Sequence, residues 1–436
     1  MKFYGRNKEI NKLLQLDAQS ASTSTFTLLI GRRRIGKTTL VRHTFNKKKW
    51  LYFFVSQKSE QLLCQELQQI VESNLGLHLY GQANKVADIL REIMIFSRQQ
   101  QVTFMIDEFQ RLYEINPSIM SEIQHVWDSE KDSAHIHLIA CGSVYSMMIK
   151  IFRDKKEPLF GRSTAELRLQ PFSTELLKNI LHDYNPNYTP EDLLTLYMIS
   201  GGVAKYVELL MDSGATTHEK MIDAVCQTGS IFLNEGVELL VGEFGKRYQV
   251  YFSIMQLIAN GQTTQSQIDN IIGSNTGRYL ATLQEEYTLI RKVRPMFAKP
   301  NSQGVKYALN DNFLMFWFRF IESNRSVIEM EKYDILKEII REGYLQFSGV
   351  LLERYFRQAY SEQARVTDVG NWWDTKSENE IDLIAIERLD KRVTIGEVKR
   401  NALKIDLNEL EEKFGTLRPH FRGYDIRFVP LSLSDM

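Results

Sequence analysis

Apolar and polar positions alternate with two different periods over the first 155 residues. Four short runs are largely apolar and rich in β-branched or aromatic residues, as strands buried on both faces of a sheet are; they span 26–30, 51–55, 102–106 and 136–140. The segments between them, such as 61–71 and 86–96, repeat apolar residues with helical spacing. Strands that alternate with helices predict an α/β domain with a parallel sheet over residues 1–155.

Between residues 156 and 245 the pattern turns helical. Residues 189–192 combine a threonine cap, a proline in the first turn and an acid three positions after the cap, which predicts a helix start. Gly201 and Gly202 interrupt the helical pattern and predict a sharp turn. We expect this segment to form a helical lid domain.

The next two segments predict a winged helix and a second α/β unit. In residues 246–325, helices are expected at 247–259, 264–272 and 275–287, followed by strands at 289–295 and 305–309. Three helices followed by a β-hairpin is the order of a winged helix. Residues 326–436 are expected to hold a helix at 345–360, strands at 380–386 and 393–398, and a helix at 407–414.

A glycine-rich loop follows the first predicted strand. It matches the pattern of a glycine, four residues, a second glycine, a lysine, and a serine or threonine. Such glycines let backbone N–H groups point at phosphate oxygens, and the N-terminus of the following helix adds partial positive charge. Lys37 is expected to reach the β- and γ-phosphates, and the Thr38 hydroxyl to coordinate Mg²⁺. The predicted ATP-binding residues of this loop are Gly31, Arg34, Gly36, Lys37, Thr38 and Thr39.

Two acids end the third predicted strand. Asp107 and Glu108 follow the apolar run 102–106. An acid at the carboxyl end of a parallel strand lies in the ligand crevice of an open sheet. Asp107 is expected to hold Mg²⁺ through water, and Glu108 to polarise the attacking water as a base. The alternative is a pair of solvated acids at a strand end.

Composition limits the partners and the compartment. Lys plus Arg equals Asp plus Glu at 54 each, so the formal charge is zero, and any contact with nucleic acid must be confined to local patches. Cys64, Cys141 and Cys226 are far apart and lack metal-ligand spacing, which argues against a disulfide framework and a zinc site. We find neither a signal-type apolar run nor an uncharged stretch of spanning length. We therefore expect a cytoplasmic location and no membrane partner.

These motifs follow one another in the order of a known family. The motifs are 3–9 with Phe3, Gly5 and Arg6, the phosphate loop, 107–110, 141–143 and 158–162. Together they resemble the archaeal-type ATPases, relatives of the STAND branch of AAA+ proteins that occur in archaea and many bacteria. In this family a proline often follows the Gly-Gly turn, whereas Ala204 follows Val203 here.

The resemblance implies roles for residues outside the phosphate loop. Phe3, Gly5 and Arg6 would pack near the adenine, and Ser143 would sense the γ-phosphate. Arg162 would stabilise developing charge, either in cis or from a neighbouring subunit of an oligomer. The alternative for Arg162 is a structural ion pair.

Basic residues gather on the predicted wing: Arg291, Lys292, Arg294, Lys299 and Lys306. A winged helix of this charge can contact DNA. The alternative is a rigid coupler between domains, a common use of winged helices in ATPases of this kind. Both interpretations stay open.

Charged residues interrupt two apolar strands near the C-terminus. Asp382 lies in the run 381–386, whose other residues are all apolar, so its charge is unexpected there. Glu397 and Lys399 are two residues apart on a strand, so they project from the same face. Two carboxylates on one face can hold Mg²⁺, and a neighbouring lysine can orient and deprotonate water.

This second pattern resembles the PD-(D/E)XK nuclease superfamily, with which archaeal-type ATPases often end. The resemblance implies a restriction-endonuclease-like α/β domain. Its metal ligands would be Glu353, Asp382 and Glu397, its catalytic lysine would be Lys399, and Mg²⁺ or Mn²⁺ would be the metal. The alternatives are an inactive nuclease fold or a buried ion pair between Lys399 and the acids.

The leading hypothesis is an ATP-dependent protein that processes nucleic acid through the winged and nuclease-like domains. A competing hypothesis is a signalling or scaffold switch, in which ATP controls assembly and the C-terminal domain binds without cutting. A third is a DNA-binding regulator that acts through the winged helix alone. The four residues Glu353, Asp382, Glu397 and Lys399 favour the first.

Overall fold

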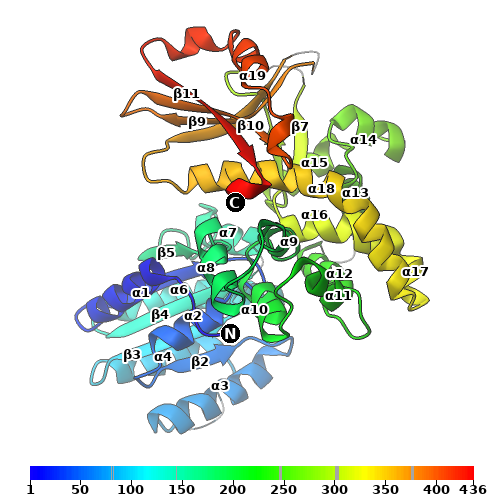
Figure 1. The fold of residues 1–436 in the computed structure, drawn as a ribbon. Coiled ribbons are helices and arrows are strands. Elements are labelled where there is room, and N and C mark those ends of the chain that lie inside the picture. Colours follow the sequence, from blue (N-terminus) through cyan, green and yellow to red (C-terminus); the bar gives the residue numbers. More distant parts are fainter. Residues whose placement is uncertain (80, 82, 144, 245–247, 300–303, 375–377) are drawn as a thin grey trace. The chain divides into compact units, whose positions relative to one another are not determined.

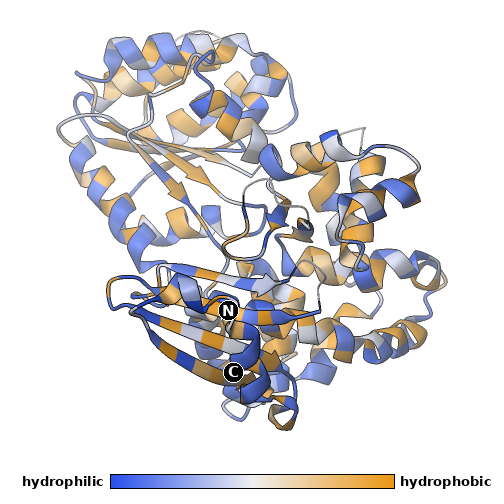
Figure 2. Ribbon diagram, turned by 90° about the horizontal axis from the view of Figure 1, so that it is seen from above, coloured by the Kyte–Doolittle hydropathy of each residue, from blue (hydrophilic) through white to orange (hydrophobic). Residues whose placement is uncertain are grey.

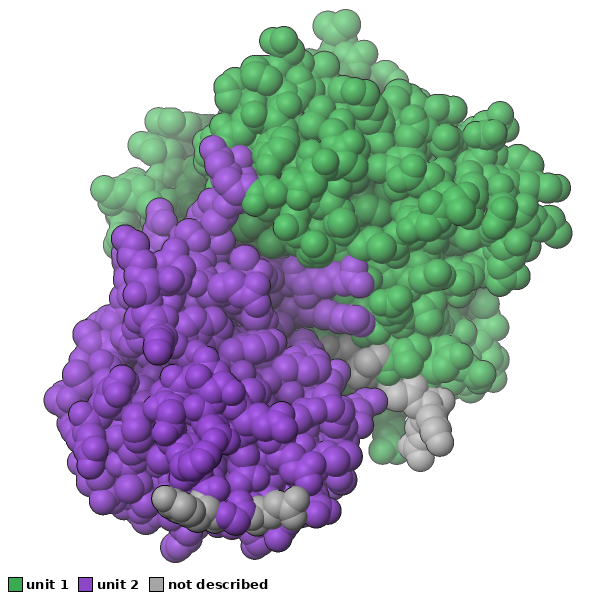
Figure 3. Space-filling view, turned by 90° about the horizontal axis from the view of Figure 1, so that it is seen from below, with its two compact units in different colours: residues 1, 171–436 green, residues 2–170 purple. Residues whose placement is uncertain are grey.

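The computed structural model describes residues 1–436 except 80, 82, 144, 245–247, 300–303 and 375–377. It divides into an N-terminal unit of residues 2–170 and a C-terminal unit of residues 171–436 together with Met1 (Figure 3). The finer division into four domains stays a prediction. Within the described residues, no helix combines the length and the apolar character needed to cross a membrane.

A five-stranded parallel sheet forms the centre of the N-terminal unit. Its order is β2-β3-β4-β1-β5, and every neighbouring pair is parallel (Figure 1). Apolar residues gather on its strands, whereas most helices mix apolar and polar residues (Figure 2). The predicted parallel-sheet α/β domain is therefore confirmed. The strands are β1 Thr25–Ile30, β2 Leu51–Phe54, β3 Val102–Asp107, β4 Ile136–Gly142 and β5 Ala165–Arg168.

Helices cover both faces of this sheet. Helix α1 packs on α2, β1 and β4 at one face. At the opposite face α3 packs on α4, and α4 packs on α6. All six residues of β1 and of β3 are buried, which explains why their sequences are continuous apolar runs and do not alternate. The helices are α1 Asn7–Ser20, α2 Lys37–Thr44, α3 Glu60–Leu75, α4 Val86–Ser97, α5 Gln110–Ile115, α6 Ser118–Glu130 and α7 Tyr145–Arg153.

A polar network fastens α1 to the sheet. The Asp17 carboxylate accepts from Lys48 Nζ at 2.7 and 2.6 Å and from Thr103 Oγ1 at 2.5 Å. The fully buried His137 places its Nδ1 3.5 Å from the same carboxylate, and its Nε2 lies 2.8 Å from Thr27 Oγ1. Burial acts to raise the pKa of Asp17, but His137, Lys48 and Thr103 outweigh it and lower the pKa to about 2.

The first part of the C-terminal unit is helical, and a hairpin follows. The predicted capping box at Thr189 is present, because its hydroxyl accepts from the N–H of Asp192 and the Asp192 carboxylate accepts from the N–H of Thr189. Three helices and two antiparallel strands then lie where a winged helix is predicted, although that assignment stays a prediction. These elements are α8 Thr174–Tyr184, α9 Pro190–Ser200, α10 Ala204–Asp212, α11 His218–Val225, α12 Phe232–Phe244, α13 Tyr248–Ala259, α14 Gln265–Ile272, α15 Gly277–Glu285, β6 Ile290–Val293 and β7 Lys306–Leu309.

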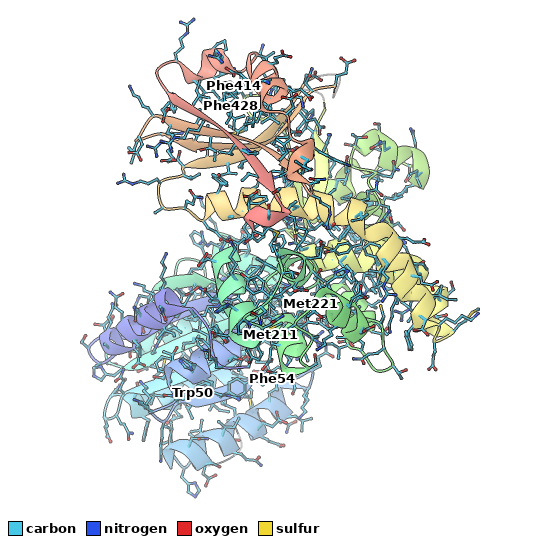
Figure 4. The ribbon with its side chains drawn as sticks, viewed as in Figure 1. Trp50, Phe54, Met211, Met221, Phe414 and Phe428 are labelled. Carbon is cyan, nitrogen blue, oxygen red and sulfur yellow. The ribbon has the colours of Figure 1, made fainter. Side chains whose placement is uncertain are left out.

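A mixed sheet closes the C-terminal unit, in the order β11-β10-β9-β8. Strands β8, β9 and β10 are antiparallel neighbours, and β11 pairs with β10 in parallel. Phe414 and Phe428, labelled in Figure 4, pack their rings at a centroid distance of 5.6 Å in its core. The elements after the hairpin are α16 Asn312–Phe316, a π-helical turn at Trp317–Ile321, α17 Arg325–Glu329, α18 Tyr333–Ser361, β8 Asp368–Trp373, β9 Glu380–Glu387, β10 Arg392–Lys399, α19 Leu407–Phe414 and β11 Asp425–Ser432.

Three strands and the first part of one helix differ from the sequence prediction. The segment from 156 onward, expected to be helical, contributes β5 to the parallel sheet. Strands β8 and β11 were not predicted, because their residues are only partly buried and alternate weakly. The helix expected at 345–360 is the second half of α18, which has 29 residues.

We expect Asp17→Asn to lower the free energy of unfolding of the N-terminal unit by about 2 kcal/mol near pH 7, because charged hydrogen bonds to Lys48 and Thr103 are lost. The folded-state pKa of about 2 lies below the ordinary 3.8, so the contribution is complete above about pH 4 and disappears as the pH falls toward 2. Urea unfolding at pH 7, 5 and 3 measures this difference.

Asp128→Asn is the matched control. Asp128 pairs with Arg162 at 2.9 Å, but its side chain is 39% exposed, so its loss should cost less than about 1 kcal/mol. Equal losses for the two variants would contradict the assigned role of the Asp17 network.

Candidate functional site

The phosphate loop joins β1 to α2 at the carboxyl edge of the parallel sheet. Gly36 has φ of 96°, a conformation that disfavours residues with a side chain. A Cβ at Gly31 would lie 2.9 Å from Ile35 and 3.1 Å from the Leu169 carbonyl, so the loop is closely packed there. Arg34 also adopts positive φ, at 68°. The structure therefore forms the tight curl that the glycine pattern predicts.

Lys37 begins α2 and is almost fully buried, at 7% exposure. Its Nζ donates to the carbonyls of Gly31 at 2.7 Å and Arg32 at 3.2 Å, so the ammonium lies within the curl of the loop. Thr38 follows in the first turn of the helix, and Thr39 is exposed. An ammonium and a helix N-terminus at one loop favour a phosphate group.

Asp107 meets Thr38 across the strand ends. The Thr38 hydroxyl donates to Asp107 Oδ2 at 2.7 Å, and the Tyr52 hydroxyl donates to the same oxygen at 3.1 Å. Burial, together with the negative charge of Asp107, raises the pKa of Tyr52 well above its ordinary value, so the phenol stays protonated. A hydroxyl and a carboxylate oxygen side by side are the hard ligands that Mg²⁺ prefers.

Glu108 turns out of the strand with φ of 56°. Its carboxylate accepts from Ser143 Oγ at 3.0 and 2.9 Å and from Gln110 Nε2 at 2.5 Å. Ser143 follows β4, the neighbour of β3, so the pairing of these two strands brings the two motifs together. The predicted sensor and the predicted base are therefore in direct contact.

The segment with Phe3, Gly5 and Arg6 lies against the phosphate loop and α2. The Phe3 ring stacks on His43 at a centroid distance of 3.9 Å with the rings 3° from parallel. Gly5 and Arg6 both have positive φ, of 63° and 66°. Arg6 Nη2 donates to the Ile35 carbonyl at 3.5 Å, and burial lowers its pKa. A role beside the adenine stays a prediction for these three residues.

Arg162 lies away from the phosphate loop. Its guanidinium binds both carboxylate oxygens of Asp128, at 2.9 to 3.2 Å, and donates to the Phe160 carbonyl. It precedes β5, which starts opposite Thr27, so it lies beyond the amino ends of the parallel strands, whereas the loop follows their carboxyl ends. This position contradicts a role in cis and matches the alternative of a structural ion pair. A role from a neighbouring subunit stays a prediction.

The acids and the lysine predicted near the C-terminus meet at β9, β10 and α18. Lys399 Nζ lies 2.7 Å from Glu397 Oε1 and 3.6 Å from Asp382 Oδ2. The same Asp382 oxygen accepts from the Val398 N–H at 2.8 Å, while Glu397 Oε2 is buried without a hydrogen-bond partner among the residues that the structure describes. Burial acts to lower the pKa of Lys399, but the hydrogen bond to Glu397 and the charge of Asp382 outweigh it and raise the pKa.

Glu353 approaches this cluster from α18. Burial and the negative charge of Asp382 raise the pKa of Glu353 to about 7. Its carboxylate pairs with Arg357 at 3.3 Å, and Arg357 also donates to the Asp382 carbonyl at 2.7 Å. The predicted three-acid ligand set is nevertheless not formed, because no group of three or more His, Cys, Asp or Glu side chains in the described part of the chain is placed to hold a metal ion.

Part of the basic cluster on the predicted wing is engaged within the C-terminal unit. Arg291 donates to Asn310 Oδ1 at 3.2 Å, and burial beside Arg354 and Arg357 lowers its pKa to about 9. Lys306 pairs with Glu380 at 3.3 Å. Lys292, Arg294 and Lys299 are exposed. The charge that the wing offers to a partner is therefore smaller than the sequence suggests.

The comparison with known families agrees with the geometry of the nucleotide site. Residues 3–210 match the model of a family described as an ATPase domain predominantly from Archaea. These residues form a P-loop ATPase domain of the archaeal type. Residues 317–410 match a second family, of archaeal and bacterial proteins of unknown function.

Relatives extend the similarity over most of this ATPase. It is 28% identical over 418 residues to an uncharacterized protein of Methanocaldococcus jannaschii, an alignment that covers 92% of this chain and 88% of the relative. Among solved structures, a Walker-type ATPase of Pyrococcus abyssi superposes with a TM-score of 0.55 at 18% identity, covering 73% of this chain and 96% of that one. The second similarity shows a shared fold.

Sequence reasoning missed two residues that touch the nucleotide site of the ATPase. Tyr52 lies in a run that was correctly predicted as a strand, but only the sheet order places β2 beside β3 and its hydroxyl on Asp107. His43 gave no signal, because it is one of several polar residues on α2, and its stacking with Phe3 joins segments that are 40 positions apart.

We expect Lys37→Met to abolish ATP hydrolysis and to weaken ATP binding by at least about 100-fold, because the buried ammonium within the curl of the phosphate loop is lost. Release of phosphate and titration with a fluorescent ATP analogue measure the two effects. Lys47→Met, at an exposed position on the following turn, is the control and should change neither by more than about twofold. An active Lys37→Met variant would contradict the assignment of the loop.

Proposed function

We propose that this ATPase uses its nucleotide state to control a metal-dependent nuclease-like domain, formed by residues 326–436, that acts on nucleic acid. The observation that carries the proposal is the meeting of Asp382, Glu397 and Lys399 on adjacent strands. Asp382 and Glu397 are buried, at 7% and 8% exposure, in strands that are otherwise apolar. Burying charge in a sheet is costly, so a purely structural sheet would have little use for it.

The donor set at this site fits Mg²⁺, and Mn²⁺ is a further candidate. Mg²⁺ is commonly held by one or two carboxylates while it keeps several waters, so the pair Asp382 and Glu397 suffices. Glu397 Oε2, which is buried and has no hydrogen-bond partner in the described part of the chain, is the oxygen left to bind such a metal ion. When bound, the metal supplies positive charge to a scissile phosphate and acidifies a water.

Each remaining side chain of the cluster then has a role. Lys399, 43% exposed at its side chain, would orient the attacking water or the leaving phosphate oxygen. Arg357 holds Glu353 and the backbone of Asp382, which fixes α18 against β9. Glu353 would contact the site through water and not as a direct ligand, since it forms no ligand group with the other two acids in the described residues.

At the nucleotide site, Lys37 would bind the β- and γ-phosphates, and Thr38 and Asp107 would hold the Mg²⁺ of the nucleotide. Glu108 would act as the base that polarises the attacking water. Ser143 would respond to the γ-phosphate; the proposal is supported by its hydroxyl, which donates to Glu108, and by its position directly after β4, the neighbour of β1.

Helix α18 is the element through which nucleotide state would reach the acids. Tyr197 of α9 donates to Gln358 at 2.8 Å, and Thr174 of α8 donates to Glu362, just after α18, at 2.6 Å. Arg400, next to Lys399, binds Glu191 of α9 at 2.5 Å. The helical segment therefore contacts α18, which carries Glu353, and Arg400, which follows Lys399. DNA would reach the cluster with the help of the exposed wing residues Lys292, Arg294 and Lys299.

We expect the purified chain to cleave labelled single- or double-stranded DNA or RNA in Mg²⁺ or Mn²⁺. Asp382→Asn should lower the cleavage rate by at least about 100-fold, because one of two metal-binding carboxylates is lost. Gel analysis of labelled strands, with and without ATP, measures the rate. Asp425→Asn, which changes an exposed acid of the same sheet, is the control and should leave cleavage unchanged.

Lys37→Met tests the coupling in the same assay. Cleavage that responds to ATP in the parent chain and ignores it in Lys37→Met would support control by the nucleotide. If no substrate is cut while ATP hydrolysis is intact, the nuclease proposal fails. The signalling or scaffold switch, in which Lys399 simply neutralises the two acids, would then be favoured.

A further inference from the structure

Gln110 is a buried amide in the nucleotide site to which the motifs assign no role. It is the first residue of α5 and is 1% exposed. Its Nε2 donates to Glu108 Oε2 at 2.5 Å, whereas its Oε1 is buried and has no hydrogen-bond partner in the described part of the chain. An unsatisfied buried acceptor costs about 1–3 kcal/mol, so the amide is expensive for the fold.

The surroundings of Gln110 fix the position of its amide. The Phe109 N–H donates to the Cys141 carbonyl at 2.9 Å, which ties the start of α5 to the end of β4. Gly142 leaves room for the side chain, because a Cβ there would lie 2.7 Å from Gln110 Oε1 and 2.4 Å from Met148. The glutamine is therefore held between β4 and α7 with its Nε2 directed at Glu108.

We infer that Gln110 is a positioning residue for ATP hydrolysis, one that acts by holding the Glu108 carboxylate. Glu108 has positive φ and lies outside the strand, so its backbone alone does not fix the direction of its side chain. Ser143 bridges both carboxylate oxygens with one hydroxyl, which leaves rotation about that contact. The second donor, from Gln110, removes this freedom.

Fixing the base matters because rate depends steeply on the placement of reacting groups. A displacement of about 1 Å in such a group can cost about 100-fold in rate. Gln110 does not touch the phosphate loop residues in any hydrogen bond that the structure records, so its effect should fall on turnover and not on ATP binding. This inference rests on the proposed role of Glu108 as the base.

The test compares Gln110→Met with Glu108→Gln and with the double variant in the full chain. Methionine keeps the volume and the unbranched shape of glutamine but has no donor. We expect Gln110→Met to lower kcat by about 10- to 100-fold while the Kd for ATP stays within about twofold. In the double variant, Gln110→Met should cause no further loss beyond that of Glu108→Gln, because the two residues act as one unit.

If Gln110 had a purely structural role, Gln110→Met would lower the thermal midpoint together with kcat. The thermal midpoint of Gln110→Met should change little, since removal of the unsatisfied Oε1 and loss of the hydrogen bond to Glu108 act in opposite directions. Gln101→Met, at another glutamine of the same unit whose Nε2 binds Asp17 and Ser20, is the control and should keep kcat within about twofold. If Gln110→Met fails to fold, Gln110→Leu serves in its place.

The outcomes separate this inference from the proposed function. Unchanged kcat in Gln110→Met, or an equal further loss in the double variant, would overturn the role of Gln110 while leaving Glu108 as the base. Unchanged kcat in Glu108→Gln would overturn the base assignment, and the inference with it.

Discussion

A charged carboxylate removed from water must find donors inside the protein, and this constraint organises both sites of the molecule. At the end of β3, Asp107 is 6% exposed and receives the hydroxyls of Thr38 and Tyr52. In β9, Asp382 is 7% exposed and receives a backbone N–H of β10. Each acid thereby links segments distant in sequence, and each leaves oxygen lone pairs facing a neighbouring hydroxyl or amine. The same demand for partners that stabilises these acids also gathers the groups needed for chemistry.

The nucleotide site was largely predictable because its signals are local. The phosphate loop is one continuous segment, its glycines are required by positive φ or close packing, and its strand is a plain apolar run. The contacts of Glu108 with Ser143 and Gln110 could not be read from the sequence. They depend on the pairing of β3 with β4, and sequence periodicity does not give the order of strands in a sheet.

The position of Arg162 and the strand β5 could not be read from the sequence for a related reason. The segment after α7 is short and half-buried, and only four residues form the edge strand, so its period cannot be told from that of a helix. Once β5 is placed beside β1, the arginine three residues before it must lie at the amino edge of the sheet. The basic wing shows a second limit of the sequence. Composition counts every charged residue, but it does not tell an exposed side chain from one that faces the interior of the unit, as Arg291 does.

Helix α18 carries its contacts on two opposite faces. Tyr344, Gln358 and the following Glu362 lie on one stripe and bind α9 and α8, while Glu353 projects about 180° away from Tyr344 toward β9. With 29 residues, the helix is roughly 43 Å long. A tilt of about 5° about one end of such a rod would carry the other end through roughly 4 Å. Glu353 lies about 30 Å from the N-terminal end, so the same tilt about that end would move it by roughly 2.6 Å. The helix thus acts as a lever arm, and a small tilt would be enough to change the reach of Glu353 to the other acids.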